Sequence, residues 1–360
     1  MGVSRGVRVG PDGSVYIADS ADNRVRKVQS ILTGYAGIAN TISLPSNDGT
    51  QLYVFDGTGR HLRTVDAFTG AAIYQFTYDS GGRVATVTDV SGNVTQINHD
   101  ASGNLVSIVG PFGSQTTYTA DANGYLATAT DPANEETQFT YSANGLMQNK
   151  TSPRGAFSQY SFDTLGRLTE DQDAAGGSKT LARSDASTGF TVTSTTALGR
   201  TTSYGTAATQ SGTFSRNNTL PNGLQSSLQF TPAGVTSVTV PDGTTTTTTE
   251  TADPRVGFGM LAPVPAVTTT TPSGITSVQT TTRAVTLSGG NLATFTEHTN
   301  LNGNTWTRLF NAGALTWTAT SPAGRQTVTT LNARGQPVQT RCQRSRRSPT
   351  RTTRTVGSAR

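Results

Sequence analysis

The segment Tyr78-Asp79-Ser80-Gly81-Gly82-Arg83-Val84 places the residues of a tight turn between strand formers. An aspartate at the first turn position accepts hydrogen bonds from the backbone that follows it, and glycine commonly occupies the fourth position of a type I turn. This segment therefore predicts two short strands joined by a turn.

The same turn recurs along the chain at a fixed spacing of 21 residues. A second turn position follows ten residues after each of its glycines, on the same period. Two turns per repeat leave strands of roughly five to seven residues, the spacing of an antiparallel β-meander. The regular copies are Asp79/Gly82, Asp100/Gly103, Asp121/Gly124, Ser142/Gly145 and Asp163/Gly166, and an earlier copy displaced by 23 residues contains Asp56 and Gly59.

Apolar side chains keep the same period. Phe76 and Tyr78 are two residues apart, so they share one face of a strand. One hairpin cannot bury such a face alone, whereas stacked copies can, so the pattern predicts an all-β, extended meander of neighbouring repeats. The predicted repeat core is Phe76, Ile97, Tyr118, Phe139 and Tyr160.

The composition agrees with a β-protein. The 360 residues are 33% hydrophobic and only 14% charged, with 39 glycines and 15 prolines, which argues against an α-rich or dinucleotide-binding enzyme. The one cysteine, Cys342, excludes an internal disulfide and a multi-cysteine metal site. No apolar stretch approaches ~18 residues, so no membrane span is expected.

The formal charge of +5 comes from the end of the chain. Residues 341–360 contain seven arginines and no acid, so residues 1–340 carry 20 basic and 22 acidic side chains. A basic arm of this kind can bind nucleic acid or an anionic surface. We favour the alternative that this low-complexity tail is a frameshift product, because residues 350–358 are codon-compatible with a Tyr-Asp-x-x-Gly-Arg-Leu turn in another frame. Nucleic acid is therefore not an expected partner.

At its regular repeats the sequence resembles the Rhs/YD-repeat family. The family motif begins with an aromatic residue, continues as Asp-x-x-Gly-Arg and ends with an aliphatic residue. It occurs here at residues 78–84 and again at Phe162-Asp163-Thr164-Leu165-Gly166-Arg167-Leu168. The resemblance implies a hollow β-shell within a large bacterial surface or secreted protein. In polymorphic toxins of this family the shell encloses a variable C-terminal effector, and related repeats occur in animal cell-adhesion proteins.

Residues 1–28 resemble a different unit, one NHL-type β-propeller blade. A propeller needs about four to eight blades, so we expect the chain to begin inside a longer protein. The sequence thus predicts a partial blade and linker (1–52), regular YD repeats (53–180), degenerate Thr-rich β repeats (181–340) and the basic tail (341–360). The start of the chain lacks the apolar core of a signal peptide, so the extracellular or cell-surface location that the resemblance implies belongs to the parent protein.

Residues that could carry chemistry have structural explanations. His99 occupies a position that is aromatic in other repeats, so we predict that its side chain packs in the sheet. A ligand or catalytic role is the alternative. The acids Glu170, Asp171 and Asp173 could bind Ca²⁺, but acids of this kind are common on turns. We therefore predict no catalytic residue, no metal site and no cofactor.

The favoured function is that of a non-enzymatic wall segment, whose partners are the remainder of the same polypeptide and its C-terminal effector. The alternative is a carbohydrate-binding or adhesive repeat surface, in which Trp306 and Trp317 would stack on sugar rings.

Overall fold

The computed structural model describes residues 4–9, 15–19, 24–28, 41–255, 264–289 and 291–343, and every regular element within them is a strand. Strands β1 (Ser4–Val9), β2 (Val15–Asp19) and β3 (Arg24–Val28) pair in an antiparallel three-stranded sheet of their own. The propeller-blade resemblance of this region stays a prediction. The predicted basic tail lies outside the described residues from 344 onward.

The remaining 27 strands form one antiparallel meander in which consecutive strands pair, and the strand order closes with the last strand (Pro337–Gln343) beside the first (Ile42–Pro45). The predicted all-β antiparallel meander is confirmed. Its first part comprises β4 (Ile42–Pro45), β5 (Gln51–Phe55), β6 (His61–Asp66), β7 (Ala72–Tyr78), β8 (Val84–Asp89), β9 (Val94–His99), β10 (Leu105–Val109), β11 (Gln115–Ala120), β12 (Leu126–Thr130), β13 (Glu136–Tyr141), β14 (Met147–Thr151), β15 (Phe157–Phe162) and β16 (Leu168–Gln172).

The sheet continues across residue 180 without interruption, because β16 pairs with β17 and β17 with β18. The second part comprises β17 (Ser178–Ala186), β18 (Gly189–Thr196), β19 (Thr201–Ala208), β20 (Phe214–Thr219), β21 (Gln225–Phe230), β22 (Thr236–Thr239), β23 (Thr245–Thr251), β24 (Val264–Thr270), β25 (Thr276–Ser288), β26 (Asn291–Leu301), β27 (Asn304–Asn311), β28 (Thr316–Thr320), β29 (Gln326–Leu331) and β30 (Pro337–Gln343).

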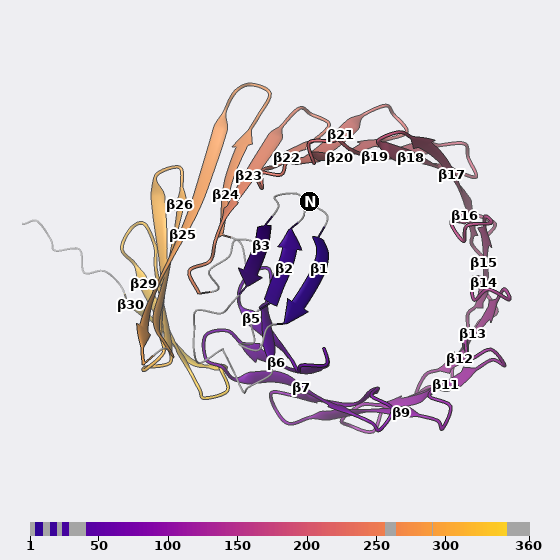
Figure 1. The fold of residues 1–360 in the computed structure, drawn as a ribbon, viewed down its shortest axis with the longest axis horizontal. Coiled ribbons are helices and arrows are strands. Elements are labelled where there is room, and N and C mark those ends of the chain that lie inside the picture. Colours follow the sequence, from indigo (N-terminus) through magenta and orange to yellow (C-terminus); the bar gives the residue numbers. More distant parts are fainter. Residues whose placement is uncertain are drawn as a thin grey trace, which may run out of the picture.

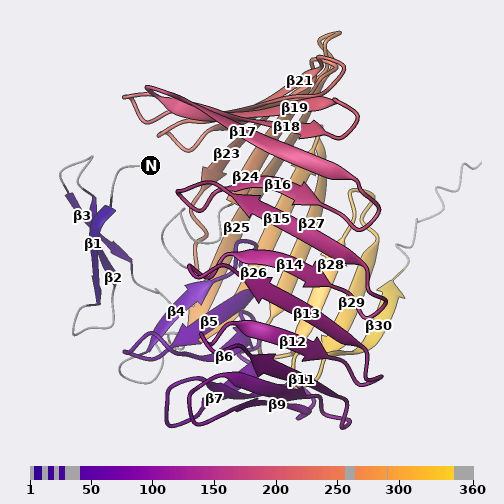
Figure 2. The same ribbon diagram turned by 90° about the vertical axis from the view of Figure 1, so that its right-hand side faces the viewer.

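The meander curves until its strand order closes into a ring (Figure 1). Strands β5 and β6 lie inside the outline of this ring, while the later strands form its wall. In the view from the side, the strands cross the wall at a steep tilt (Figure 2). A bulge interrupts the ladder at each repeat hairpin, as between Thr77 and Tyr78 and between Ser161 and Phe162. Because bulges increase local twist and bend a strand, their regular recurrence curves the sheet.

The wall is a single sheet thick over most of the ring. Among the residues that the structure describes, two small clusters are buried: one of Leu52, Val54, Val65 and Ala67, and one of Leu292, Phe295 and Phe310. The burial is therefore concentrated where the start of the meander meets its late strands.

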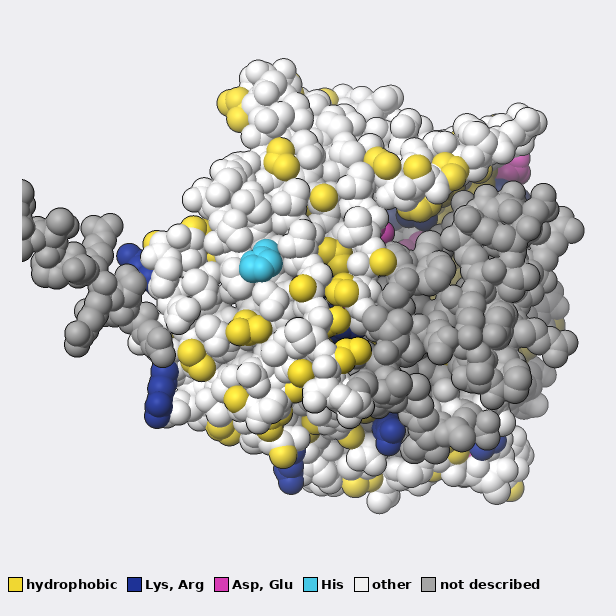
Figure 3. All heavy atoms as spheres, turned by 60° about the vertical axis from the view of Figure 1, so that its left-hand side comes forward, with side chains coloured by type: hydrophobic (Ala, Val, Ile, Leu, Met, Phe, Trp, Pro, Cys, Tyr) yellow, Lys and Arg dark blue, Asp and Glu magenta, His cyan; other side chains and the backbone are white. Residues whose placement is uncertain are grey.

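Cross-strand hydroxyl and amide pairs add to the backbone ladders of the wall. The hydroxyls of Thr286 and Thr294 lie 2.7 Å apart across β25 and β26, and the Asn300 amide donates to the Thr305 hydroxyl at 2.9 Å. On the side of the ring at the left of Figure 1, charged side chains are few and hydrophobic ones are scattered singly over uncharged polar surface (Figure 3). Each cross-strand hydroxyl or amide pair contributes roughly 0.2–1 kcal/mol to the stability of the sheet.

Candidate functional site: the repeat turns and the closure of the ring

Each repeat turn is a type I turn completed by a glycine bulge, as the first motif shows. The Gly82 N–H donates to the Asp79 carbonyl at 3.0 Å, and the Asp79 N–H donates to the Arg83 carbonyl at 2.8 Å. The Asp79 carboxylate accepts from the Arg83 N–H at 2.9 Å and from Arg83 Nε at 2.8 Å. Gly82 has a φ of +79°, a left-handed conformation that costs any other residue energy.

The predicted turn residues repeat this geometry along the chain. Asp56, Asp100, Asp121 and Asp163 each accept a hydrogen bond from the N–H four residues later. Ser142 makes the same bond with its hydroxyl at 3.2 Å. The predicted turn glycines all have positive φ: Gly59, Gly82, Gly103, Gly124, Gly145 and Gly166.

These bonds stabilise the ionised aspartates. The backbone N–H of the following arginine, then its guanidinium, holds the pKa of Asp79 and of Asp163 below the ordinary value. The turn carboxylates are therefore engaged in local structure.

Adjacent repeats pack turn on turn. The His99 Nδ1 lies 3.8 Å from the Asp79 carboxylate, one repeat earlier, with its side chain 14% exposed. The ring of Tyr141 packs against that of Tyr125 with centroids 5.3 Å apart. Burial, followed by the charge of Asp121, raises the pKa of Tyr141. The residue before one turn thus packs against the turn region of the preceding repeat.

The predicted repeat core lies in the wall strands but is only half-buried. This holds for the residues predicted above: Phe76 in β7, Ile97 in β9, Tyr118 in β11, Phe139 in β13 and Tyr160 in β15. A wall one sheet thick leaves these side chains partly exposed because no second sheet covers them.

An aromatic cluster lies where the ring closes. Phe68, from the connection between β6 and β7, packs edge-on against Phe295 and Trp317 at centroid distances of 5.1 and 4.8 Å. Phe310 is fully buried and packs against the Phe68 side chain, with ring centroids 5.5 Å apart. Residues more than 220 positions apart therefore form one core. Trp306, by contrast, is 41% exposed.

A buried ionic network extends this cluster. Asp253, in the connection after β23, is fully buried and accepts from Arg255 Nε at 3.0 Å, from Arg255 Nη2 at 2.8 Å and from Arg283 Nη1 at 2.8 Å. Arg283 also donates to Glu297 at 2.8 Å. The Arg255 guanidinium lies 4.7 Å from the ring centroids of both Phe68 and Phe295, which is cation–π geometry.

The network keeps Asp253 ionised. Burial alone would raise the pKa of this carboxyl group, but the hydrogen bonds and charge of Arg255, together with the bond from Arg283, outweigh it and hold the pKa below 3.8. The charges of its two carboxylates and two guanidinium groups balance. Because Arg283 lies on β25 and Glu297 on β26, the ion pairs tie the β23–β24 connection to these two strands.

Sequence reasoning missed this network. Asp253 and Arg283 are 30 positions apart and belong to no repeat column, so no local spacing marks them. Trp317, which the carbohydrate-binding alternative would place against a sugar ring, packs in the aromatic cluster. In the part of the chain that the structure describes, no three His, Cys, Asp or Glu side chains form a metal-binding group, and no helix could span a membrane.

Comparison with known proteins decides the family. The sequence pattern of the teneurin YD-shell family matches residues 39–353, which includes every strand of the ring. The chain belongs to the teneurin YD-shell family. As a YD-shell segment it also matches individual teneurins, among them teneurin-m of Drosophila melanogaster, with 38% identity over 88 residues, and human teneurin-4, with 36% over 83 residues.

These matches cover 24% and 23% of the YD-shell chain, which spans about 3% of the length of either relative. Among solved structures, the TcdB2–TccC3–TEV crystal structure superposes with a TM-score of 0.37 and 11% identity, over 89% of this chain and 20% of that one. The TcdB2–TccC3–Cdc42 crystal structure gives a TM-score of 0.36 and 12% identity, over 90% of this chain and 22% of that one.

Proposed function

We propose that this chain is a non-enzymatic wall segment of a YD shell, which encloses a polypeptide and separates it from solvent. The observation that carries the proposal is the closed ring of 27 strands. Closed sheets of about 16 to 18 strands already surround a water-filled channel, so the side chains of a one-layer ring of this size cannot fill its interior.

The enclosed polypeptide is, in this proposal, the effector or another part of the same parent protein. A ring held together by hydroxyl pairs and turn-on-turn packing suits a container, because such contacts are distributed along the wall and none requires a bound ligand. We place the parent protein outside the cell or at the cell surface, as the family resemblance implies.

The non-enzymatic role is supported by what the most reactive side chains contact. The His61 ring is packed between Phe55 and Phe76, with centroid distances of 4.9 and 4.4 Å. Burial lowers the pKa of His61. The Asp79 carboxylate, which faces His99, is engaged by Arg83. These groups contribute to packing and turn formation.

Two measurements test the proposal separately. Small-angle scattering should give a radius of gyration well above the roughly 21 Å expected of a compact chain of this length. A value near 21 Å would contradict the hollow ring.

For enclosure, a trypsin-sensitive reporter peptide is fused to the chain and its cleavage rate is compared with that of the free peptide. Cleavage at least tenfold slower in the fusion is expected, and equal rates would contradict enclosure. A fusion that carries Phe310→Ala, which opens the closure cluster, is the matched control and should lose the protection.

A further inference from the structure

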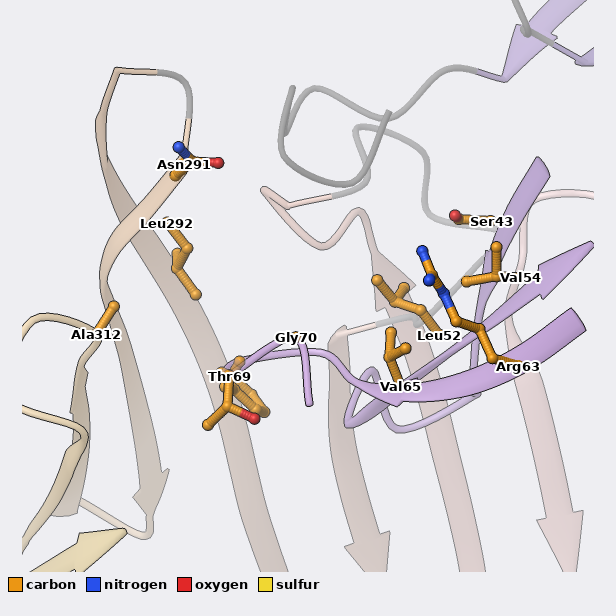
Figure 4. Close-up of a pocket in the computed structure, with 11 residues that line it drawn as sticks. Ser43, Leu52, Val54, Arg63, Val65, Thr69, Gly70, Asn291, Leu292 and Ala312 are labelled. Carbon is orange, nitrogen blue, oxygen red and sulfur yellow. The ribbon is translucent and has the colours of Figure 1, made fainter. Parts of the chain in front are cut away.

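A cavity of about 330 Å³ lies between the start of the meander and its late strands. Leu52, Val54 and Val65, on β5 and β6, form one side, and Leu292 of β26 lies across from them (Figure 4). The volume falls within the range of about 300–1,000 Å³ that small-molecule sites occupy. The lining is shared between apolar side chains and polar groups, so the cavity suits a ligand that has both an apolar part and a polar group.

One cation points into this apolar space. Figure 4 shows the Arg63 side chain extending from β6 between Ser43, Leu52 and Val54. Its Nε is buried and has no hydrogen-bond partner, and within residues 41–255, 264–289 and 291–343 no carboxylate pairs with its guanidinium group. A buried, unpaired N–H costs free energy that a ligand oxygen would recover.

The other arginines beside this region are compensated. Arg255 bonds to Asp253, and Arg283 bonds to both Asp253 and Glu297. Arg255 also has a buried nitrogen without a hydrogen-bond partner, Nη1, but Asp253 balances its charge, whereas no carboxylate of the described residues pairs with Arg63. The planar guanidinium fork matches the two oxygens of a carboxylate.

We propose that this cavity is a binding site for a carboxylate carried on a short apolar chain, with Arg63 holding the carboxylate and Leu52, Val65 and Leu292 surrounding the chain. Two sources offer this chemistry: a free fatty acid, and the C-terminal carboxylate of a peptide that ends in an aliphatic residue. Because residues of β5, β6 and β26 line the site, carboxylate binding does not require that the ring enclose a polypeptide.

Calorimetric titration of the purified chain with octanoate and with N-acetyl-leucine tests both sources. Saturable binding of at least one of these carboxylates is expected, and the tighter one identifies the source. Octanol and N-acetyl-leucinamide are the uncharged controls and should bind at least tenfold more weakly. Equal affinity for the charged and uncharged forms, or binding of neither carboxylate, would overturn the proposal.

Two variants assign the site to its residues. Arg63→Met should weaken carboxylate binding at least tenfold, whereas Arg183→Met, on an exposed arginine paired with Asp185, should leave it unchanged. Leu292→Trp, which fills the cavity from the opposite side, should abolish binding of both probes. Circular dichroism establishes that each variant keeps its strands. Full affinity in folded Arg63→Met would remove the proposal, and Leu292→Trp decides the outcome if Arg63→Met does not fold.

Discussion

Replacing Asp253 with asparagine should open the ring at its closure. The substitution keeps the shape of the side chain but leaves the Arg255 guanidinium, 5% exposed, without a carboxylate partner, and leaves Arg283, 10% exposed, with Glu297 alone. Removing one partner of a buried ion pair typically costs about 3–5 kcal/mol. Much of that cost is the desolvation of the charges left behind, so it should appear as weaker docking of the β23–β24 connection.

The assay uses the two tryptophans. In a Trp306→Phe background, fluorescence reports Trp317 alone, whose ring packs 4.8 Å from Phe68 in the closure cluster. Urea titration should then show that Asp253→Asn exposes Trp317 at clearly lower denaturant than the parent. The matched control is Asp185→Asn, which breaks an ion pair whose aspartate is 62% exposed, and it should cost no more than about 1 kcal/mol. Equal shifts for the two variants would refute the argument that burial makes the Asp253 network essential.

Three further predictions concern the Asp253 carboxyl group, the buried Phe310 ring and the Gly145 turn. Because its folded pKa is lowered, Asp253 contributes stability above its ordinary pKa of 3.8 and loses that contribution as the pH falls through the folded value, so the Trp317 transition should move to lower urea below about pH 4. Phe310→Ala should cost about 3–5 kcal/mol by the same readout, because the ring is fully buried; a cost under 1 kcal/mol would contradict the closure core. Gly145→Ala should destabilise by more than the roughly 1–2 kcal/mol of a left-handed φ, since its Cβ would lie 2.8 Å from the Tyr125 ring. Gly110→Ala should be nearly neutral in thermal unfolding, because Gly110 has no left-handed φ and its Cβ would meet Ser114 only at an ordinary contact distance of 3.6 Å.

The repeat wall could be predicted from local sequence because its physics is local. The Asp79 carboxylate and the Gly82 backbone are three residues apart, and the interactions that form the turn stay within five residues. A 21-residue period repeats this unit, so strand length, turn position and the all-β meander follow from spacing alone. The family resemblance rested on the same residues, and the YD-shell match agrees with it.

The closure of the ring depended on information that no local pattern contains. Phe68 meets Phe310, and Asp253 meets Arg283, only because the accumulated bend of the meander brings its beginning against its late strands. The same is true of the cavity in which Arg63 has no counter-charge. The sequence alone determined the unit of the wall, whereas the tertiary structure decided where the wall closes, because curvature is a sum over many repeats and closure contacts form between residues far apart in the chain.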